Sequence, residues 1–174
     1  MPSIFSHAVA ATAMGQWYPK RALPARFWIW TAISSMLPDA DVISFAFGVP
    51  YGDLLGHRGI THSLFFAVVI GALVARIVGA GSKEQDPAYV PLTIYFALVM
   101  TSHGLLDALT NGGSGIAFFA PFDSSRYFLP WRPIQVSPIG MGFFSARGMA
   151  VLFSELGWIW LPAALLGLLG KHRS

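Results

Sequence analysis

Long apolar runs separated by short polar clusters make up most of this chain. Residues 61–79 and 88–109 are two such runs, with a polar turn at 81–87 between them, and a third run covers residues 149–169. Each run is close to the roughly 20 apolar residues that cross a bilayer core. We therefore predict three spanning helices, of which the first two form an antiparallel hairpin.

Two shorter apolar segments precede these runs. Residues 3–14 predict a short N-terminal helix, with Ser3 as its N-cap, that is too short to span a membrane. Residues 26–37 predict another apolar helix, which ends at Pro38, and residues 42–47 predict a further short one. The expected fold is an all-α, polytopic membrane helical bundle with three to four spanning helices and a short N-terminal helix.

Composition supports a membrane location for one domain that covers residues 1–174. The chain is 55% hydrophobic and 11% charged, with a mean hydropathy of +0.59, whereas soluble domains carry about 25% charged residues. Its net charge of +3 comes from scattered basic residues, which indicates anionic membrane lipid as a partner and no nucleic acid. No cysteine is present, so a metal would have to bind nitrogen and oxygen ligands. The first residues lack the features of a secretory signal, so we expect them to be retained.

Residues 57–63, with the sequence HRGITHS, place two imidazoles and a guanidinium at the start of the first long run. On one continuous helix, His57 and His62 would lie about 140° apart and could not bind one ion together. With His57 in a loop, a bend at Gly59 and Thr61 as the helix cap, both rings turn toward a common point. This arrangement predicts two metal ligands and leaves Arg58 to face substrate.

Two carboxylates, Asp39 and Asp41, come shortly before this motif. Their spacing places both side chains on one side of an extended segment. Carboxylates beside apolar helices need a cationic partner. We predict that both bind metal, although either one alone could instead be the N-cap of the helix at 42–47.

His103 and Asp107 lie one turn apart on one face of the second long run. Because the hairpin brings the start of its first helix beside the end of its second, His62 should lie near both. Asp107 could alternatively form a simple hydrogen-bonded pair with His103, but ionisable groups in spanning helices usually mark functional sites. His7 is either a further ligand or a core histidine with one hydrogen bond.

Residues 118–144 form a long aromatic and proline-rich segment, for which we predict an ordered flap over the site. Within it, Arg126 and Arg132 either bind a phosphate group or anchor the flap among headgroups. Trp131 belongs to the same expected substrate-binding set. Glu155, inside the last apolar run, is either a ligand or acid–base group, or the ion-pair partner of Arg147.

Imidazole and carboxylate together suit zinc or another first-row dication, whereas magnesium and calcium prefer oxygen ligands. A carboxylate that bridges two such ions, about 3.5–4 Å apart, makes a site suited to displacement at phosphorus. We expect one to three divalent ions, with zinc favoured. The predicted metal ligands are His7, Asp39, Asp41, His57, His62, His103 and Asp107. The predicted catalytic residues are Asp39, Arg58 and Glu155, and the predicted substrate-binding residues are Arg58, Arg126, Trp131 and Arg132.

Four motifs in order, SH at 6–7, LPDAD at 37–41, HRGITHS at 57–63 and HGLLD at 103–107, resemble those of the bacterial membrane-bound metal-dependent hydrolase family. Some members of that family are controlled by the LexA repressor. The segment from 119 to 138 is also similar to the later part of the family, so the resemblance covers most of the chain. It implies a small multi-pass protein of the bacterial inner membrane. The spacing of His103 and Asp107 is distantly similar to a pair in zinc-dependent phospholipase C, whose N-terminal tryptophan ligand has no counterpart here.

The predicted function is therefore hydrolysis of an ester or phosphodiester in a lipid-like or phosphate-containing substrate by a metal-activated water. Two alternatives stay open. A metal ion transporter would place its ligands near the middle of the bilayer, with a polar path to both sides. A non-catalytic lipid-binding membrane protein would hold a metal only for stability.

Overall fold

The computed structural model describes residues 1–19, 23–80 and 89–172, and within these ranges the chain forms helices and loops but no strand. The predicted polar turn at 81–87 lies outside the described residues. The helices are α1 (Ile4–Gly15), α2 (Ala25–Met36), the 3-10 helices η1 (Leu37–Phe47) and η2 (Ile60–His62), α3 (Leu64–Gly79), α4 (Tyr89–Ala108), the 3-10 helix η3 (Gly140–Phe143), α5 (Ala146–Glu155), the π-helix η4 (Leu156–Trp160) and α6 (Leu161–Lys171). The prediction of an all-helical fold is confirmed.

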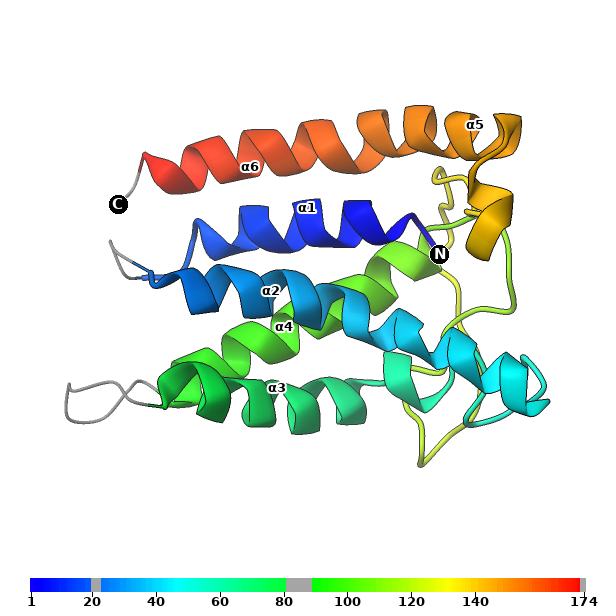
Figure 1. The fold of residues 1–174 in the computed structure, drawn as a ribbon, viewed down its shortest axis with the longest axis horizontal. Helices are drawn as coiled ribbons and strands as arrows, with labels where there is room; N and C mark the ends of the chain where they lie inside the picture. The colour runs from blue at the N-terminus through cyan, green and yellow to red at the C-terminus, as the bar shows by residue number, and fades with distance from the viewer. Residues whose placement is uncertain (20–22, 81–88, 173–174) are drawn as a thin grey trace.

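The long helices run along the longest axis of the molecule (Figure 1). Helix α1 lies between α2 and the rod made by α5, η4 and α6, and α4 packs against α1, α2 and α3. The end of α2, the start of α3 and the end of α4 meet at the same end of the bundle, where α1 begins (Figure 1). The topology therefore gathers segments that lie far apart in the sequence at one end of the molecule.

Helices α3 and α4 form the predicted antiparallel hairpin, and they approach each other closely at Gly71. A Cβ atom at Gly71 would lie 2.7 Å from the backbone nitrogen of Ala97. The apolar core beside the hairpin contains Phe27 from α2 with Tyr95 and Phe96 from α4, and the rings of Phe27 and Tyr95 stack at 4.8 Å. Small residues at a helix contact and an aromatic layer next to it hold α4 in place.

Replacing Gly71 with alanine is expected to lower the free energy of unfolding by about 1–3 kcal/mol, because the new methyl group overpacks the hairpin. Thermal unfolding in detergent, followed by circular dichroism, measures the change. Gly157→Ala is the matched control, because no heavy atom lies within 4 Å of the Cβ that this change adds. Equal losses in both variants would show that the close contact with Ala97 does not limit the packing.

Two helical segments among the described residues are long and apolar enough to cross a membrane. They are Tyr89–Ala108 and the continuous rod Ala146–Lys171. Helix α3 has 16 residues, fewer than the 19 predicted from the sequence at 61–79, and α1 has 12. The structure therefore supports a membrane helical protein, while the expected number of three to four spans stays a prediction.

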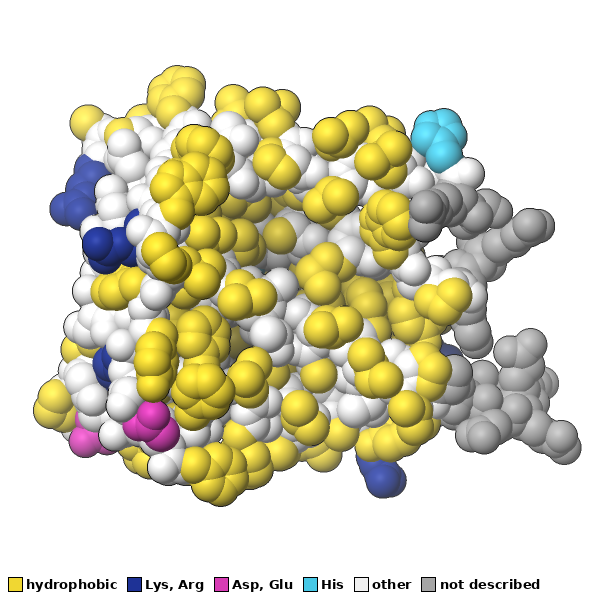
Figure 2. Space-filling view, turned by 180° about the vertical axis from the view of Figure 1, so that it is seen from behind, with side chains coloured by type: hydrophobic (Ala, Val, Ile, Leu, Met, Phe, Trp, Pro, Cys, Tyr) yellow, Lys and Arg dark blue, Asp and Glu magenta, His cyan; other side chains and the backbone are white. Residues whose placement is uncertain are grey.

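Apolar side chains cover much of the surface of the bundle. Figure 2 shows hydrophobic side chains across the middle of one face, with the visible charged side chains toward its two ends. Val68 and Leu73 on α3, Leu98 on α4 and Leu165 on α6 are each at least half exposed. Soluble monomers rarely expose contiguous apolar surface on this scale, which is the surface expected of helices that face lipid.

Two local predictions are wrong, and both errors concern segments beside the site. Asp39 and Asp41 lie on the 3-10 helix η1 and not on an extended segment, and this helix already begins at Leu37. Ser63, and not Thr61, is the N-cap of α3, because its hydroxyl accepts a hydrogen bond from the backbone N–H of Phe66 at 3.1 Å. Thr61 is thereby left free to bond elsewhere.

Candidate metal centre

Five buried side chains from four helices converge at one end of the bundle. His7 comes from α1, Asp39 from η1, His62 from η2, and His103 and Asp107 from the last two turns of α4. Each is at most 5% exposed. The i, i+4 spacing of His103 and Asp107 places both on one face of α4, and the hairpin brings His62 against them, as predicted from the sequence.

The ligand-type atoms of these side chains face one another across short distances. Nε2 of His103 lies 3.1 Å from Nε2 of His62 and 3.3 Å from Oδ1 of Asp39. Nε2 of His62 lies 3.6 Å from Oδ1 of Asp39 and 3.5 Å from Oδ2 of Asp107. Zinc–nitrogen bonds of about 2.0–2.1 Å in tetrahedral geometry separate two ligands by roughly 3.3 Å. The observed separations match the edges of such a coordination shell.

The hydrogen bonds of the two imidazoles engage their Nδ1 atoms and leave both Nε2 atoms facing inward. Nδ1 of His103 donates to the carbonyl oxygen of Ser35 at 2.7 Å. Nδ1 of His62 donates to the hydroxyl of Thr61 at 3.0 Å, and this hydroxyl donates in turn to Asp41 at 2.6 Å. In the neutral form of both rings, the Nε2 atoms point lone pairs at each other across 3.1 Å. Such an arrangement repels unless a cation or a proton lies between them.

His7 extends the cluster on the other side of the carboxylates. Its ring stacks on His103 with 3.7 Å between the ring centroids. Its Nε2 lies 3.4 Å from Oδ1 of Asp107 and 4.0 Å from Oδ2 of Asp39. Each of these two carboxylates therefore directs one oxygen at His62 or His103 and the other at His7. This is the disposition in which a carboxylate can bridge two ions.

Unsatisfied hydrogen-bonding groups mark the same residues. Both oxygens of Asp39, both oxygens of Asp107 and both ring nitrogens of His7 are buried without a hydrogen-bond partner, and of these atoms Oδ2 of Asp107 forms an ion pair with Nε of Arg58. Leaving a buried polar atom unpaired costs about 1–3 kcal/mol, and charged groups cost more. A cation bound among these three residues would satisfy their unpaired atoms. The donor set, imidazole and carboxylate, fits a first-row dication such as zinc.

Asp41 lies behind His62 and forms an outer layer with His57. Its Oδ1 lies 2.6 Å from Nδ1 of His57, and its Oδ2 accepts from Thr61 and from the backbone N–H of Arg58. Burial alone would raise the pKa of Asp41, but hydrogen bonds from His57 and His62 outweigh it and hold this pKa well below its usual range. Asp41, His57 and His62 also form a second group whose ligand-type atoms all lie within 4.8 Å of one another.

The 3-10 geometry of η1 explains why the two aspartates face different partners. At 3.0 residues per turn, side chains two positions apart point about 120° from each other. Asp39 therefore faces His62 and His103, while Asp41 faces His57 and Thr61. Burial opposes the charge of Asp39 as well, but His103 and His62 keep its pKa below the usual value. Asp39 is thus the inner ligand candidate, and Asp41 orients the imidazoles.

Replacing Asp41 with asparagine is expected to weaken metal binding by 10- to 100-fold, which is roughly the cost of losing an outer partner that orients a histidine ligand. Competition with a chromophoric zinc chelator on the purified protein measures this change. Asp53→Asn is the control, because Asp53 is exposed and its Oδ1 bonds only the nearby N–H of Leu55. An affinity that Asp41→Asn leaves unchanged would remove Asp41 from the site.

Arg58 does not face an open substrate site, which corrects the prediction from the sequence. It is 0% exposed, and its Nε lies 3.1 Å from Oδ2 of Asp107. Its two other nitrogens donate to the carbonyl oxygen of Gly112 and the hydroxyl of Thr110 at 3.0 and 3.1 Å. The guanidinium is thus fully engaged inside the protein, where it fixes the position of Asp107.

The bend in the motif arises differently from the predicted glycine hinge. Arg58 itself adopts a left-handed backbone with φ of 64°, whereas Gly59 has φ of −84°. Gly59 is required for close approach, because a Cβ atom there would lie 2.2 Å from the carbonyl oxygen of Leu54. The bend directs the Arg58 side chain inward and lets His57 and His62 face Asp41 from two sides.

The predicted substrate-binding residues occupy the loops that cover this end of the bundle. Arg126 donates to the backbone carbonyl oxygens of Tyr51, Asp53 and His57, so it braces the loop that carries the motif. Arg132 is exposed and lies over the Phe128 ring at 4.7 Å. Trp131, also exposed, packs edge-on against Trp158. Arg132 and Trp131 therefore remain accessible to a ligand, whereas the Arg126 guanidinium is committed to backbone carbonyls.

Glu155 is neither a member of the metal cluster nor the partner of Arg147, and both readings from the sequence are corrected. The carboxylate is 0% exposed. It accepts hydrogen bonds from the backbone N–H of Ser3 and from the hydroxyls of Ser3 and Ser6, the latter at 2.8 Å. Glu155 therefore fastens α5 to the start of α1, the helix that presents His7.

Ser35, Thr61 and Thr110 support the cluster but were not among the predicted site residues. Their roles depend on contacts across long sequence separations, as between Ser35 and His103. The role of Ser63 as the N-cap of α3 could have been predicted, because a serine directly before a long apolar run is typical of an N-cap. Ser35 offers a backbone carbonyl, which any residue could provide, so no sequence signal marks it.

The fold and the site define a helical membrane protein with a buried histidine–aspartate cluster that could hold a metal ion. The chain belongs to the YdjM inner membrane protein family, whose model matches residues 1–172. It is 38% identical over 175 residues to Inner membrane protein YbcI of Escherichia coli (strain K12), covering 99% of each chain. No solved structure matches the chain. The prediction of a bacterial inner-membrane protein is confirmed, while hydrolase activity and control by LexA stay predictions.

Proposed function

We propose that this chain is a membrane-bound metal-dependent hydrolase that cleaves an ester or phosphodiester bond in a lipid-like substrate. The observation that carries the proposal is the convergence of His7, Asp39 and Asp107, whose buried ligand-type atoms have no hydrogen-bond partner, beside the inward-facing Nε2 atoms of His62 and His103. Such a donor set, at one end of an inner-membrane helical bundle, favours metal chemistry next to the lipid headgroups.

His62 and His103 would hold zinc or a related dication together with Asp39 and Asp107, and His7 would complete a second position with the same carboxylates. When bound, such ions lower the pKa of a water to about 7 and offset negative charge that develops on the substrate. If only one ion is bound by His62 and His103, Oδ2 of Asp39, 4.0 Å from Nε2 of His7, is left without a metal and would accept a proton from that water. Asp41 keeps the His62 ring in its orientation, and Arg58 does the same for Asp107.

The location of the cluster supports a lipid-like substrate. The loop after α4 pairs with the segment that carries Trp131 and Arg132, since the backbone N–H of Asn111 donates a hydrogen bond to the carbonyl oxygen of Ile134 at 2.9 Å. This pairing keeps an exposed cation and an exposed indole at the same end of the bundle as Asp107. In the proposed reaction Arg132 attracts an anionic headgroup, while three to four spanning helices, including α3 and α4, place the site at the bilayer surface.

A screen of lipid hydrolysis by the zinc-loaded protein tests the proposal, with phospholipid and lipid-phosphate substrates in mixed micelles and mass spectrometry of the products. We expect at least one substrate class to be cleaved and the His103→Ala variant to be inactive on it. Equal turnover by the wild type and His103→Ala would contradict the assigned site. If the wild type cleaves no substrate class, the proposed hydrolase activity is refuted.

Full burial of the cluster favours a second candidate, a metal held only for stability, because a catalytic ion needs an open coordination position. Asp107→Asn distinguishes a catalytic metal from a structural one. If the metal is structural, this variant should be less stable, and neither the wild type nor the variant should hydrolyse lipid. Metal transport has less support, because the donors lie at the ends of helices and not halfway along them. Uptake of zinc into proteoliposomes would restore that alternative.

A further inference from the structure

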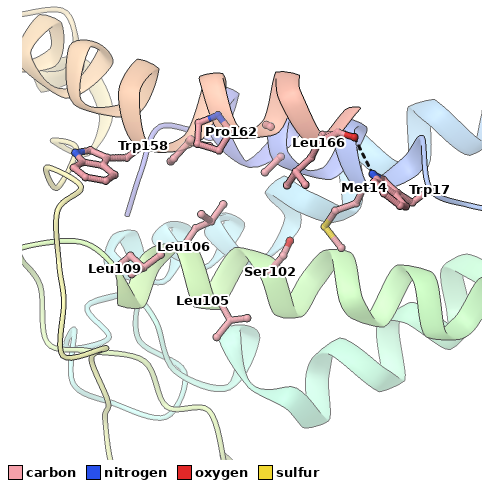
Figure 3. A pocket seen from close by; sticks show the side chains of 13 residues that line it. Met14, Trp17, Ser102, Leu105, Leu106, Leu109, Trp158, Pro162 and Leu166 are labelled. Atoms are coloured by element: carbon pink, nitrogen blue, oxygen red, sulfur yellow. Dashed lines mark hydrogen bonds between the residues drawn. The ribbon is translucent and has the colours of Figure 1, made fainter. Parts of the chain in front are cut away.

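An apolar groove runs along the bundle. It has a volume of about 340 Å³ and lies between α1, α4 and the rod of η4 and α6. In Figure 3, Leu109 and Trp158 lie toward one end of the groove and Met14 and Trp17 toward the other, with Leu106 and Pro162 between them. The volume is within the range of roughly 300–1,000 Å³ that small-molecule sites occupy.

The groove offers almost no polar group to a ligand. Its one serine, Ser102, turns its hydroxyl back to the carbonyl oxygen of Val99 in its own helix at 2.7 Å. The indole N–H of Trp17 donates to the carbonyl oxygen of Leu166 at 2.9 Å, across the far end of the groove (Figure 3). The other lining side chains are aliphatic or aromatic, so a hydrocarbon chain fits and a polar ligand does not.

The groove is built into segments that are long and apolar enough to span the membrane, Tyr89–Ala108 and Ala146–Lys171. Because the protein lies in the inner membrane, the surroundings of these segments are rich in acyl chains. The π-helix at Leu156–Trp160 ends two residues before Pro162, which lacks the N–H that would bond the carbonyl of Trp158. The groove lies along this interrupted stretch of the helix, so the positions of its lining side chains depend on the π-helix and on Pro162.

One end of the groove lies at the same end of the bundle as the metal centre, because Leu109 follows the end of α4 (Figure 3). Leu106 directly precedes Asp107 on α4, Leu109 follows it by two residues, and Ser102 directly precedes His103. On α1, Ala10 and Met14 lie one and two turns after His7. At the same end, Trp158 packs against Trp131, the neighbour of the exposed Arg132. A chain in the groove would therefore carry its headgroup at the end of the bundle that holds the cluster and the exposed Arg132.

We propose that this groove binds one acyl chain of a membrane phospholipid, with the headgroup end at Leu109 and Trp158. Its link to catalysis rests on the proposed function, whereas binding of the chain does not. One water molecule occupies about 30 Å³ in the liquid, so the groove has room for roughly ten groups of that size. This corresponds to a large part of one acyl chain. The groove thereby selects single extended chains and fixes the depth of the headgroup.

Photolabelling in nanodiscs tests this proposal. The discs contain phosphatidylethanolamine and phosphatidylglycerol, with a small share of phosphatidylethanolamine that carries a diazirine midway along one acyl chain. We expect labels on the groove residues of α4 and α6, as identified by mass spectrometry. Ala163→Trp, which fills the groove from α6, should reduce this labelling at least fivefold. Ala150→Trp, at an exposed position on α5, should not.

Equal labelling of the groove in Ala163→Trp and Ala150→Trp would overturn the proposal, as would label spread evenly over exposed residues such as Val68. If circular dichroism shows that Ala163→Trp is unfolded, Ala10→Phe fills the groove from α1. The His103→Ala variant separates the two proposals, because it should keep the labelling and lose hydrolysis. Groove labelling without hydrolysis in the wild type refutes only the hydrolase, and hydrolysis without groove labelling refutes only the groove.

Discussion

Asp39→Asn is expected to abolish metal binding at the centre and hydrolysis with it. Both oxygens of Asp39 are buried without a hydrogen-bond partner and face three histidines. An asparagine keeps the shape but replaces one anionic oxygen with an N–H₂ donor, which repels a cation. The loss should exceed the roughly 10- to 100-fold that removal of an outer partner costs. Metal content after purification and initial rates of lipid hydrolysis measure the two effects.

The Asp53→Asn variant controls for the loss of one negative charge, since Asp53 is exposed. A chelator provides a second readout that does not depend on knowing the substrate. The wild type should melt at a lower temperature once its metal is removed, because a ligand that binds only the folded state stabilises it. Asp39→Asn should not respond to the chelator, and a response as large as that of the wild type would show that metal binds elsewhere.

Arg58→Met is expected to lower the free energy of unfolding by about 3–5 kcal/mol, the cost of removing one partner from a buried ion pair. The change leaves Asp107 without its guanidinium and leaves the carbonyl of Gly112 and the hydroxyl of Thr110 unpaired. Titration of the unfolding with a denaturing detergent, followed by tryptophan fluorescence, measures the loss.

Arg132→Met is the matched control for Arg58→Met, because it removes an exposed guanidinium from the same end of the molecule. Its expected effect is within about 0.5 kcal/mol, as for most surface substitutions. Should both variants lose the same small amount, the buried pair between Arg58 and Asp107 would not stabilise the fold.

Hydrophobic patterning predicted the helices because length and apolarity follow directly from the sequence. The predicted segments at 3–14 and 26–37 match α1 (Ile4–Gly15) and α2 (Ala25–Met36) within one residue at each end. The hairpin of α3 and α4 then placed His62 beside His103 and Asp107, since an antiparallel pair leaves no other choice. Topology alone thus predicted the centre of the site.

Side-chain direction could not be predicted in the same way. The sequence predicted that the charge of Arg58 faces a substrate, but the left-handed backbone of this residue turns its side chain toward Asp107. Glu155 had a nearby cation in the sequence, yet its partners Ser3 and Ser6 lie about 150 residues away. These outcomes depend on packing between elements, and local periodicity contains no information about it.

The wrong prediction of an extended segment at 39–41 also affected the predicted roles of Asp39 and Asp41 at the metal centre. An extended segment would have pointed Asp39 and Asp41 at the same ion, whereas the 3-10 helix divides them between an inner and an outer position. The residue types were therefore predicted correctly as candidates, but their division into layers required the structure.

Metal analysis of the purified protein by inductively coupled plasma mass spectrometry, in lipid nanodiscs and without added metal, tests the assignment of the centre most directly. We expect one to three equivalents of zinc or another first-row dication per chain in the wild type, and a loss of the bound metal in Asp39→Asn. A correctly folded wild-type protein that contains no metal, and takes up none from a micromolar zinc solution, would contradict the assignment.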